Sequence, residues 1–446
     1  MQHTSDKLGT EKLSKLIINY SVPSVIGTVV MSLYNIVDRI FIGQGVGPLA
    51  ISGLTLTFPF MILLMACGML IGAGSASRIS ITLGENNLVK AEKILGNAMT
   101  LTLLISGGVS LLTYIFMDEI LMLFGGTEET IQYAREYMQI IVPASVISAI
   151  NFGFNNIMRA SGFPRKAMQT MLIGAVVNVI LDALFIFVFE WGIRGAAIAT
   201  VISYLISSAW VLNHFRLPAS PIHFKKYAFK LERETVNSIL SIGFSPFSMQ
   251  VATSLVVILI NSTLMKYGGD LAIGAYGIIN SLLIFIVMIV LGLNQGTQPI
   301  VGYNYGAKQY DRVFKTIKIS AYIATGLTTM GFILGMFFSE ISVSLFTSDP
   351  ELKAIAANAL RISIIMFPVV GFQIVMSNFF QSIGKAKIAI FLSLTRQFIF
   401  LIPALLILPG IWQLNGAWAV MPVSDGLSAV VSAITFFVFY RNFKRL

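Results

Sequence analysis

Two aspartates lie inside long apolar stretches, where an ionised carboxylate is costly. Asp38 lies in SVPSVIGTVVMSLYNIVDRIFIG and Asp182 in AMQTMLIGAVVNVILDALFIFVF. At the centre of a bilayer such a group costs about 2.5–3.5 kcal/mol even on insertion-based scales. A chain that keeps a carboxylate there binds a cation to it, pairs it with a base or protonates it. We therefore treat both aspartates as candidates for an ion or proton site.

Other polar side chains lie one helical turn from these acids. Asn178 precedes Asp182 by four residues, which places both on one helix face. Tyr34 precedes Asp38 by the same interval, and Thr200 lies in the apolar stretch that follows Asp182. Carboxylate, amide and hydroxyl oxygens are ligands that small hard cations prefer, and two neighbouring acids can equally share a proton. These residue types leave Na⁺ and H⁺ open.

The alternative interpretation of the two acids needs no bound ion. Asp38 would pair with the adjacent Arg39 at the outer membrane interface, and Asp182 would be held by Asn178 alone. Asp182 lies deeper in its stretch and has no base beside it, so the ion-site interpretation depends more on Asp182 than on Asp38.

The composition is that of a membrane protein. The 446 residues are 56% hydrophobic and 11% charged, with a mean hydropathy of +0.82, whereas soluble domains carry about 25% charged residues. The net charge of +10 is dispersed over many short loops, which favours membrane topology over nucleic-acid binding as its explanation. The single cysteine, Cys67, excludes an intrachain disulfide.

Apolar runs between charged or Pro- and Gly-rich breaks predict an all-α polytopic membrane protein with twelve transmembrane helices. The predicted spans are 16–42, 50–80, 94–117, 132–158, 167–190, 195–215, 237–265, 272–300, 315–340, 354–381, 388–410 and 416–440. The loops alternate in charge: one set carries most of the Lys and Arg residues and the other is mostly acidic. Because positive loops stay in the cytoplasm, we expect a multi-pass protein of the cytoplasmic (inner) membrane with both termini cytoplasmic.

The two halves of the chain resemble each other at an offset of about 222 residues. PLAISG at 48–53 matches DLAIGA at 270–275, and RASGFPRKA at 159–167 matches QSIGKAKIA at 381–389. Each half holds six predicted spans, so both enter the membrane in the same orientation. This is the pattern of a parallel repeat, related by a pseudo-twofold axis along the membrane normal.

The repeat predicts three parts. These are an N-terminal six-helix bundle over 1–215, a cytoplasmic linker over 216–236 and a C-terminal six-helix bundle over 237–446. Two bundles that face each other across a cleft are typical of a transporter. A symmetric scaffold without moving parts is the alternative.

These features together resemble the multidrug and toxic compound extrusion (MATE) family, in its MepA-like and DinF-like branch. The resemblance covers essentially the whole chain and rests on the two parallel halves, on Asp38 in VDRIFIG and on the Asn178/Asp182 spacing. The segments GAGSASRISITLGENN (72–87) and MRASGFPRKAM (158–168) also fit the loop patterns of that family.

The resemblance implies a secondary active multidrug efflux transporter and not an enzyme. It would export amphipathic, often cationic, organic compounds in exchange for H⁺ or Na⁺ by alternating access, as a monomer in the lipid bilayer and with no cofactor beyond the coupling ion. The coupling site that it implies comprises Asp38, Asn178, Asp182 and Thr200. Tyr34 and Tyr137 would be hydrogen-bonding groups nearby, and Pro23 would bend the first span.

The C-terminal half holds one further acid in an apolar stretch. We predict that Asp425 pairs with Arg396 of the neighbouring span, because unpaired charges at that depth are costly. A second proton-linked or substrate-contacting site is the alternative. The NorM-like branch of the family has acids in spans 7 and 10, where this sequence has only amides, so a cation site of that kind is not expected. Amides that could line the cleft, or simply pack between helices, are Asn151, Asn155, Gln250, Asn280 and Asn294.

Three other functions fit less of the sequence. A lipid-linked saccharide flippase of the same superfamily would need several cationic groups for a pyrophosphate, and here only Arg396 and Arg361 qualify. An intramembrane enzyme would need a serine elbow, a metal-binding histidine pair or an acid dyad on facing motifs, and none is recognisable. A passive channel would differ only in lacking the coupling step.

Overall fold

The computed structural model describes residues 7–123 and 128–443, and over these ranges the chain is helical without a strand. The N-terminal bundle follows short α1 (Lys7–Thr10) and comprises α2 (Leu13–Gly45), α3 (Pro48–Gly84), α4 (Leu88–Ile115), α5 (Met117–Leu123), α6 (Glu128–Ile141), α7 (Ser145–Ala160), α8 (Pro164–Ala183), the π-helical η2 (Leu184–Val188) and α9 (Gly192–His214).

The C-terminal bundle follows the short 3₁₀ helix η3 (Lys226–Phe229) of the linker. It comprises α10 (Arg233–Gly306), α11 (Tyr310–Phe337), α12 (Ser339–Ser344), α13 (Pro350–Ser363), α14 (Phe367–Ser382), α15 (Ala386–Leu394), the π-helical η4 (Thr395–Leu401) and α16 (Ile402–Phe443).

The described ranges confirm the predicted all-α fold of twelve spans. Eight helical segments are long and apolar enough to cross a bilayer, and two bent helix pairs can each cross as one span. Two of the eight segments are too long for one crossing: α10 has 74 residues, about 110 Å if straight, against a hydrocarbon core of about 30 Å. Each of these two is broken once, α10 at Gly269 and α16 at Gln413, so each supplies two spans.

Four spans are less regular than predicted. The fourth and tenth are bent by 61° and 55° between α6 and α7 and between α13 and α14. Pro143 lies in the first break and Pro368 opens α14 after the second, and a proline cannot donate the backbone hydrogen bond that would continue a helix. The fifth and eleventh spans each turn π-helical, at η2 and η4.

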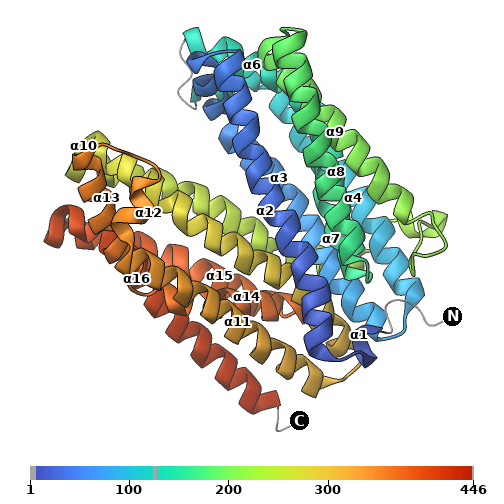
Figure 1. Cartoon of the computed structure of the whole chain (residues 1–446). Coiled ribbons are helices and arrows are strands. Elements are labelled where there is room, and N and C mark those ends of the chain that lie inside the picture. Colours follow the sequence, from blue (N-terminus) through green and yellow to red (C-terminus); the bar gives the residue numbers. More distant parts are fainter. Residues whose placement is uncertain (1–6, 124–127, 444–446) are drawn as a thin grey trace.

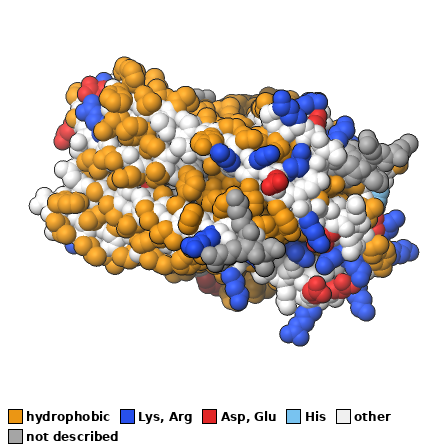
Figure 2. Space-filling view, turned by 90° about the horizontal axis from the view of Figure 1, so that it is seen from below, with side chains coloured by type: hydrophobic (Ala, Val, Ile, Leu, Met, Phe, Trp, Pro, Cys, Tyr) orange, Lys and Arg blue, Asp and Glu red, His pale blue; other side chains and the backbone are white. Residues whose placement is uncertain are grey.

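The two bundles form the arms of a V whose closed end lies toward the chain termini (Figure 1). One buried apolar cluster joins both bundles at the closed end and includes Tyr20 and Phe154 with Ile300 and Phe379. The other clusters each draw on a single bundle. Lys and Arg side chains gather toward the end of the molecule that lies at the right of Figure 2, and hydrophobic side chains cover most of the rest.

Glycines permit close crossing of helices at the closed end. A Cβ added at Gly243 of α10 would lie 1.6 Å from the Leu70 carbonyl oxygen of α3, and one at Gly74 would lie 2.1 Å from that of Ile239. At such approach only a residue without a side chain fits. The close packing of α3 on α10 therefore requires glycine at positions 74 and 243.

Gly269 provides a test of how α10 is divided into two spans. Its φ of 64° and ψ of −161° belong to a backbone region that essentially only glycine adopts, and no atom lies within 4 Å of a Cβ built there. Gly269→Ala should lower the midpoint of thermal unfolding in detergent, since the backbone strain alone costs about 1–3 kcal/mol. Gly277→Ala, in equally open space but at an ordinary helical φ, is the matched control and should leave the midpoint unchanged or raise it. Equal effects of both substitutions would contradict this assignment.

Candidate functional site

The two aspartates singled out in the sequence meet in the N-terminal bundle. Helices α2 and α8 pack side by side, and they bring Asp38 and Asp182 close enough for the two carboxyl groups to interact electrostatically. Asp182 is 0% exposed. A carboxyl group can donate to another only if one of them is protonated, so without a proton or a cation two like charges would face each other here.

The polar neighbours expected from the sequence surround this pair. Asn178, 1% exposed, donates from Nδ2 to the Thr200 hydroxyl of α9 at 3.3 Å. Tyr137 of α6 is buried with its hydroxyl close to Thr200. Tyr34 of α2 lies close to Tyr204 of α9. The structure thus brings four helices, α2, α6, α8 and α9, to one polar cluster.

The cluster contains more buried acceptors than donors. Asp38 Oδ1, both carboxylate oxygens of Asp182 and Asn178 Oδ1 are buried and accept no hydrogen bond from the residues that the structure describes. A buried polar atom without a partner costs about 1–3 kcal/mol, and more when charged. Four such oxygens in one cluster form a set that a proton or a small cation would satisfy.

Arg39 does not neutralise Asp38 by an ion pair. None of the ion pairs among the described residues joins the two. The Arg39 guanidinium lies instead over the ring of Phe58, 4.5 Å from its centroid. This position is favourable because a cation over an aromatic face is attracted to the ring. The Arg39 side chain is also exposed.

Each bundle has a π-helical segment beside its buried charge. In α8 the helix becomes π-helical at Leu184, two residues after Asp182. In the eleventh span the π segment opens at Thr395, one residue before Arg396. π segments inside α-helices occur frequently at functional sites because they change which side chains share a face.

The remaining predicted residues occupy different environments. α2 is continuous across Pro23, and the next residue, Ser24, donates to the Tyr20 carbonyl at 2.8 Å. Asn155 is buried and donates to the Ala167 carbonyl at 2.8 Å. Asn294 is buried with both side-chain polar atoms unpaired among the described residues. Asn151 and Gln250 are half-buried and Asn280 is exposed.

A cross-bundle contact that the sequence did not indicate centres on Arg159. This arginine, at the end of α7, is 3% exposed and belongs to no ion pair among the described residues. It donates to Asn155 Oδ1 at 2.6 Å and to Gln295 Oε1 of α10. The sequence places Arg159 in a basic loop set, and only the packing reveals that its charge is buried between the bundles.

The C-terminal bundle contains an ion pair at the predicted position. Arg396 Nε donates to Asp425 Oδ1 at 2.5 Å, and the Asp425 side chain is 6% exposed. The two residues come from the eleventh and twelfth spans. Their charges compensate each other, in contrast to the acid pair of the N-terminal bundle.

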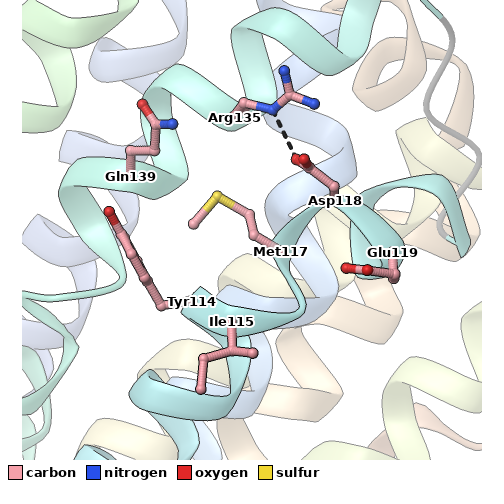
Figure 3. A pocket seen from close by; sticks show the side chains of 7 residues that line it. All are labelled: Tyr114, Ile115, Met117, Asp118, Glu119, Arg135 and Gln139. Atoms are coloured by element: carbon pink, nitrogen blue, oxygen red, sulfur yellow. Dashed lines mark hydrogen bonds and ion pairs between the residues drawn. The ribbon is translucent and has the colours of Figure 1, made fainter.

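A separate polar cavity of about 240 Å³ lies at the open end of the N-terminal bundle, where α4, α5 and α6 meet (Figure 3). Arg135 Nε donates to Asp118 at 2.7 Å across it, and Gln139 and Tyr114 also line it. It shares no residue with the Asp38–Asp182 cluster and belongs to the surface of the bundle.

A comparison with known protein families shows which family this chain belongs to. The model of one family, described as MatE, matches residues 23–184 and 246–406. The chain belongs to the MatE family. The family predicted from the sequence is thereby confirmed, and this MatE protein is a multi-pass membrane transporter and not an enzyme.

Similar proteins cover nearly the full chain. "Multidrug export protein MepA" of Staphylococcus haemolyticus (strain JCSC1435) is 26% identical over 433 residues, which are 97% of this chain and 94% of the relative. The protein of the same name from Staphylococcus aureus (strain MSSA476) is 26% identical over 422 residues, or 94% and 92% of the two chains.

Solved structures of other proteins share the fold of this chain. The "MATE multidrug transporter DinF-BH" is 37% identical, with a TM-score of 0.90 over 98% of both chains. The "outward-facing conformation of a multidrug resistance MATE family transporter of the MOP superfamily" is 23% identical, with a TM-score of 0.92 over 99% of this chain and 98% of the other. At that identity the second likeness shows the fold alone.

The Arg396–Asp425 pair predicts a non-additive response to mutation. Asp425→Asn alone leaves a half-buried guanidinium without its partner and should destabilise the MatE protein, by less than the ~3–5 kcal/mol of a fully buried pair. The double variant Arg396→Gln/Asp425→Asn removes both charges and should recover most of the wild-type thermal midpoint. The measurement is unfolding in detergent across the four members of the mutant cycle. Additive losses in the double variant would show that the two charges do not stabilise each other.

Proposed function

We propose that this MatE protein is a secondary active multidrug exporter that exchanges amphipathic, often cationic, organic compounds for H⁺ or Na⁺ by alternating access. Likeness to proteins named for multidrug export over nearly the whole chain, and 37% identity to the multidrug transporter DinF-BH, support the substrate class. The observation that carries the coupling is the Asp38–Asp182 cluster with its four unpaired buried oxygens.

The coupling ion would act by its differential affinity for two conformations. An ion moves a conformational equilibrium only as far as it binds one state better than the other. The cluster draws its oxygens from four helices, α2, α6, α8 and α9, so small shifts between these helices would change the coordination of a bound ion. Occupation of the site would favour one arrangement of the bundle and loss of the ion the other.

Alternating access requires that the contacts closing the V can break. Among the described residues, the hydrogen bonds that join the two bundles lie in the half of the molecule near the termini or at its middle. Ser77 accepts from Gln298 at 2.9 Å and donates to the Gln381 carbonyl at 2.9 Å. Arg159 and Gln295 add a charged contact. With both termini cytoplasmic, as the basic loops favour, this state would open outward.

Neutralising either acid tests the coupling site. Asp38→Asn and Asp182→Asn should each reduce ethidium efflux from cells by about fivefold or more, since a coupling free energy of ~1–3 kcal/mol would be lost. Efflux is measured with the H⁺ and Na⁺ gradients collapsed separately, so that the gradient whose loss stops wild-type efflux identifies the ion.

The matched control for this experiment is Asp118→Asn. Asp118 is also an aspartate of the N-terminal bundle, but it pairs with Arg135 at the surface cavity, so its substitution should leave efflux near the wild-type rate. Full gradient-dependent efflux in both acid variants would reject the site, and efflux that survives collapse of both gradients would reject antiport.

The Arg159–Gln295 contact predicts a shift in conformation. Gln295→Leu removes the acceptor and leaves the buried guanidinium with less compensation, which should lower the outward-open population by about tenfold or more, given ~1.5–3 kcal/mol for a hydrogen bond to a charged group. Spin labels at exposed positions Gln132 of α6 and Glu351 of α13, two helices at the outer ends of the arms (Figure 1), report the change as a new shorter distance. Adding Arg159→Met to Gln295→Leu removes the stranded charge and should restore the long distance. An unchanged distance distribution in Gln295→Leu would contradict this role.

A further inference from the structure

The linker between the bundles is fixed to the N-terminal bundle. Asn97 of α4 donates to the carbonyls of Ala228 at 2.9 Å and Lys230 at 3.0 Å, and its Oδ1 accepts the backbone N–H of Glu232 at 2.9 Å. A Cβ added at Gly96 would lie 2.4 Å from the Ala228 carbonyl oxygen. The backbone of the linker therefore lies directly on α4.

Side chains hold the same segment in place. The Tyr227 hydroxyl donates to Glu92 at 2.6 Å, and this carboxylate raises the pKa of Tyr227 to about 12. Phe224 packs against the rings of Phe154 and Phe215, with centroids 6.0 and 5.7 Å away. The conformation of the linker is thus set by a carboxylate on one side and an aromatic cluster on the other.

The register of these contacts on α4 defines the depth of the linker in the bilayer. Thr100 donates to the Phe229 carbonyl at 2.9 Å. On the same helical face, one turn further, Leu104 is 59% exposed, and Leu111 two turns beyond that is 62% exposed. We expect such exposed leucines on a spanning helix to contact hydrocarbon. The Phe229 contact on α4 therefore lies about 6 Å along the helix from the first of them.

The outward surface of this segment combines aromatic, aliphatic and basic groups. Tyr227, Phe229 and Leu231 are 49%, 39% and 40% exposed, and three lysines between and beside them are also exposed: Lys225, Lys226 and Lys230. Aromatic rings at the edge of the hydrocarbon lie at the headgroup level. Lysines next to them place cationic heads among the lipid phosphates, and such clusters attract anionic lipids.

We propose that residues 225–231 form a docking surface for anionic phospholipid headgroups of the leaflet at the closed end of the V. The leaflet is the cytoplasmic one under the topology proposed above. Because the segment is bonded to α4 and leads directly into α10, a lipid-bound linker anchors the N-terminal bundle while the C-terminal bundle moves about the start of α10.

The test uses the full chain in nanodiscs of phosphatidylcholine with a minor fraction of phosphatidylglycerol. A fluorophore is attached at Leu231→Cys in a Cys67→Ser background, and bromine is placed on the acyl chains of one lipid at a time. We expect quenching by brominated phosphatidylglycerol to correspond to an enrichment of about tenfold or more over its bulk fraction. The enrichment should fall as ionic strength rises.

Two triple variants separate this surface from the general basic character of the molecule. K225Q/K226Q/K230Q should abolish the enrichment. K308Q/K315Q/K318Q removes the same charge from exposed lysines of the C-terminal bundle and should retain it. Loss of enrichment in both triples would overturn the proposal, as would bulk-like quenching in the parent.

Competition by a free anion distinguishes a surface for lipid headgroups from a site for phosphate. If inorganic phosphate at millimolar concentration displaced phosphatidylglycerol, the surface would be a phosphate site and the proposal would fail. Thermal midpoints of the triples check their folding. Nanodiscs expose both membrane faces and the readout is lipid contact, so a negative result is distinguishable from failure of the proposed antiport.

Discussion

The bilayer requires that every polar group in its interior find a partner within the chain or a ligand, and this constraint accounts for most of the arrangement described here. Helices satisfy the backbone. Arg396 and Asp425 satisfy each other, and Arg159 is compensated by two amide oxygens. Asp38 and Asp182 instead face each other among further acceptors. The proposed coupling depends on these unpaired acceptors, because an ion can favour one conformation only if it supplies contacts that the protein lacks without it.

The two bundles share a repeat but differ in charge. The repeat supplies equivalent helices, and each bundle has a π segment beside its buried charge in the fifth or eleventh span. One bundle holds an acid pair and the other a compensated ion pair. Because an ion pair already balances its own charge, the C-terminal bundle has less reason to bind a cation. The asymmetry therefore supports our proposal that the coupling ion binds in the N-terminal bundle.

Equivalent positions of the two repeats also supply contacts at the closed end of the V. Arg159 and Gln381 occupy matching positions in the segments RASGFPRKA and QSIGKAKIA. Each reaches the opposite bundle, Arg159 through its side chain to Gln295 and Gln381 through its carbonyl to Ser77. Only one of the two equivalent contacts carries a charge. Glycines in α3 and α10 allow these two helices to cross at backbone distance.

The sequence by itself determined the membrane class, the twelve spans, the parallel repeat, the family and the polar residues of the N-terminal bundle. Those features depend on composition, hydrophobic length and short-range spacing, which are local properties of a chain. The tertiary structure decided which groups meet. Tyr204 lies close to Tyr34, Arg39 lies over Phe58, Arg159 is buried against Gln295, and the linker lies on α4. Spacing along one helix specifies a face but not the helix that packs against it, and contacts across hundreds of residues depend on packing that no local pattern encodes.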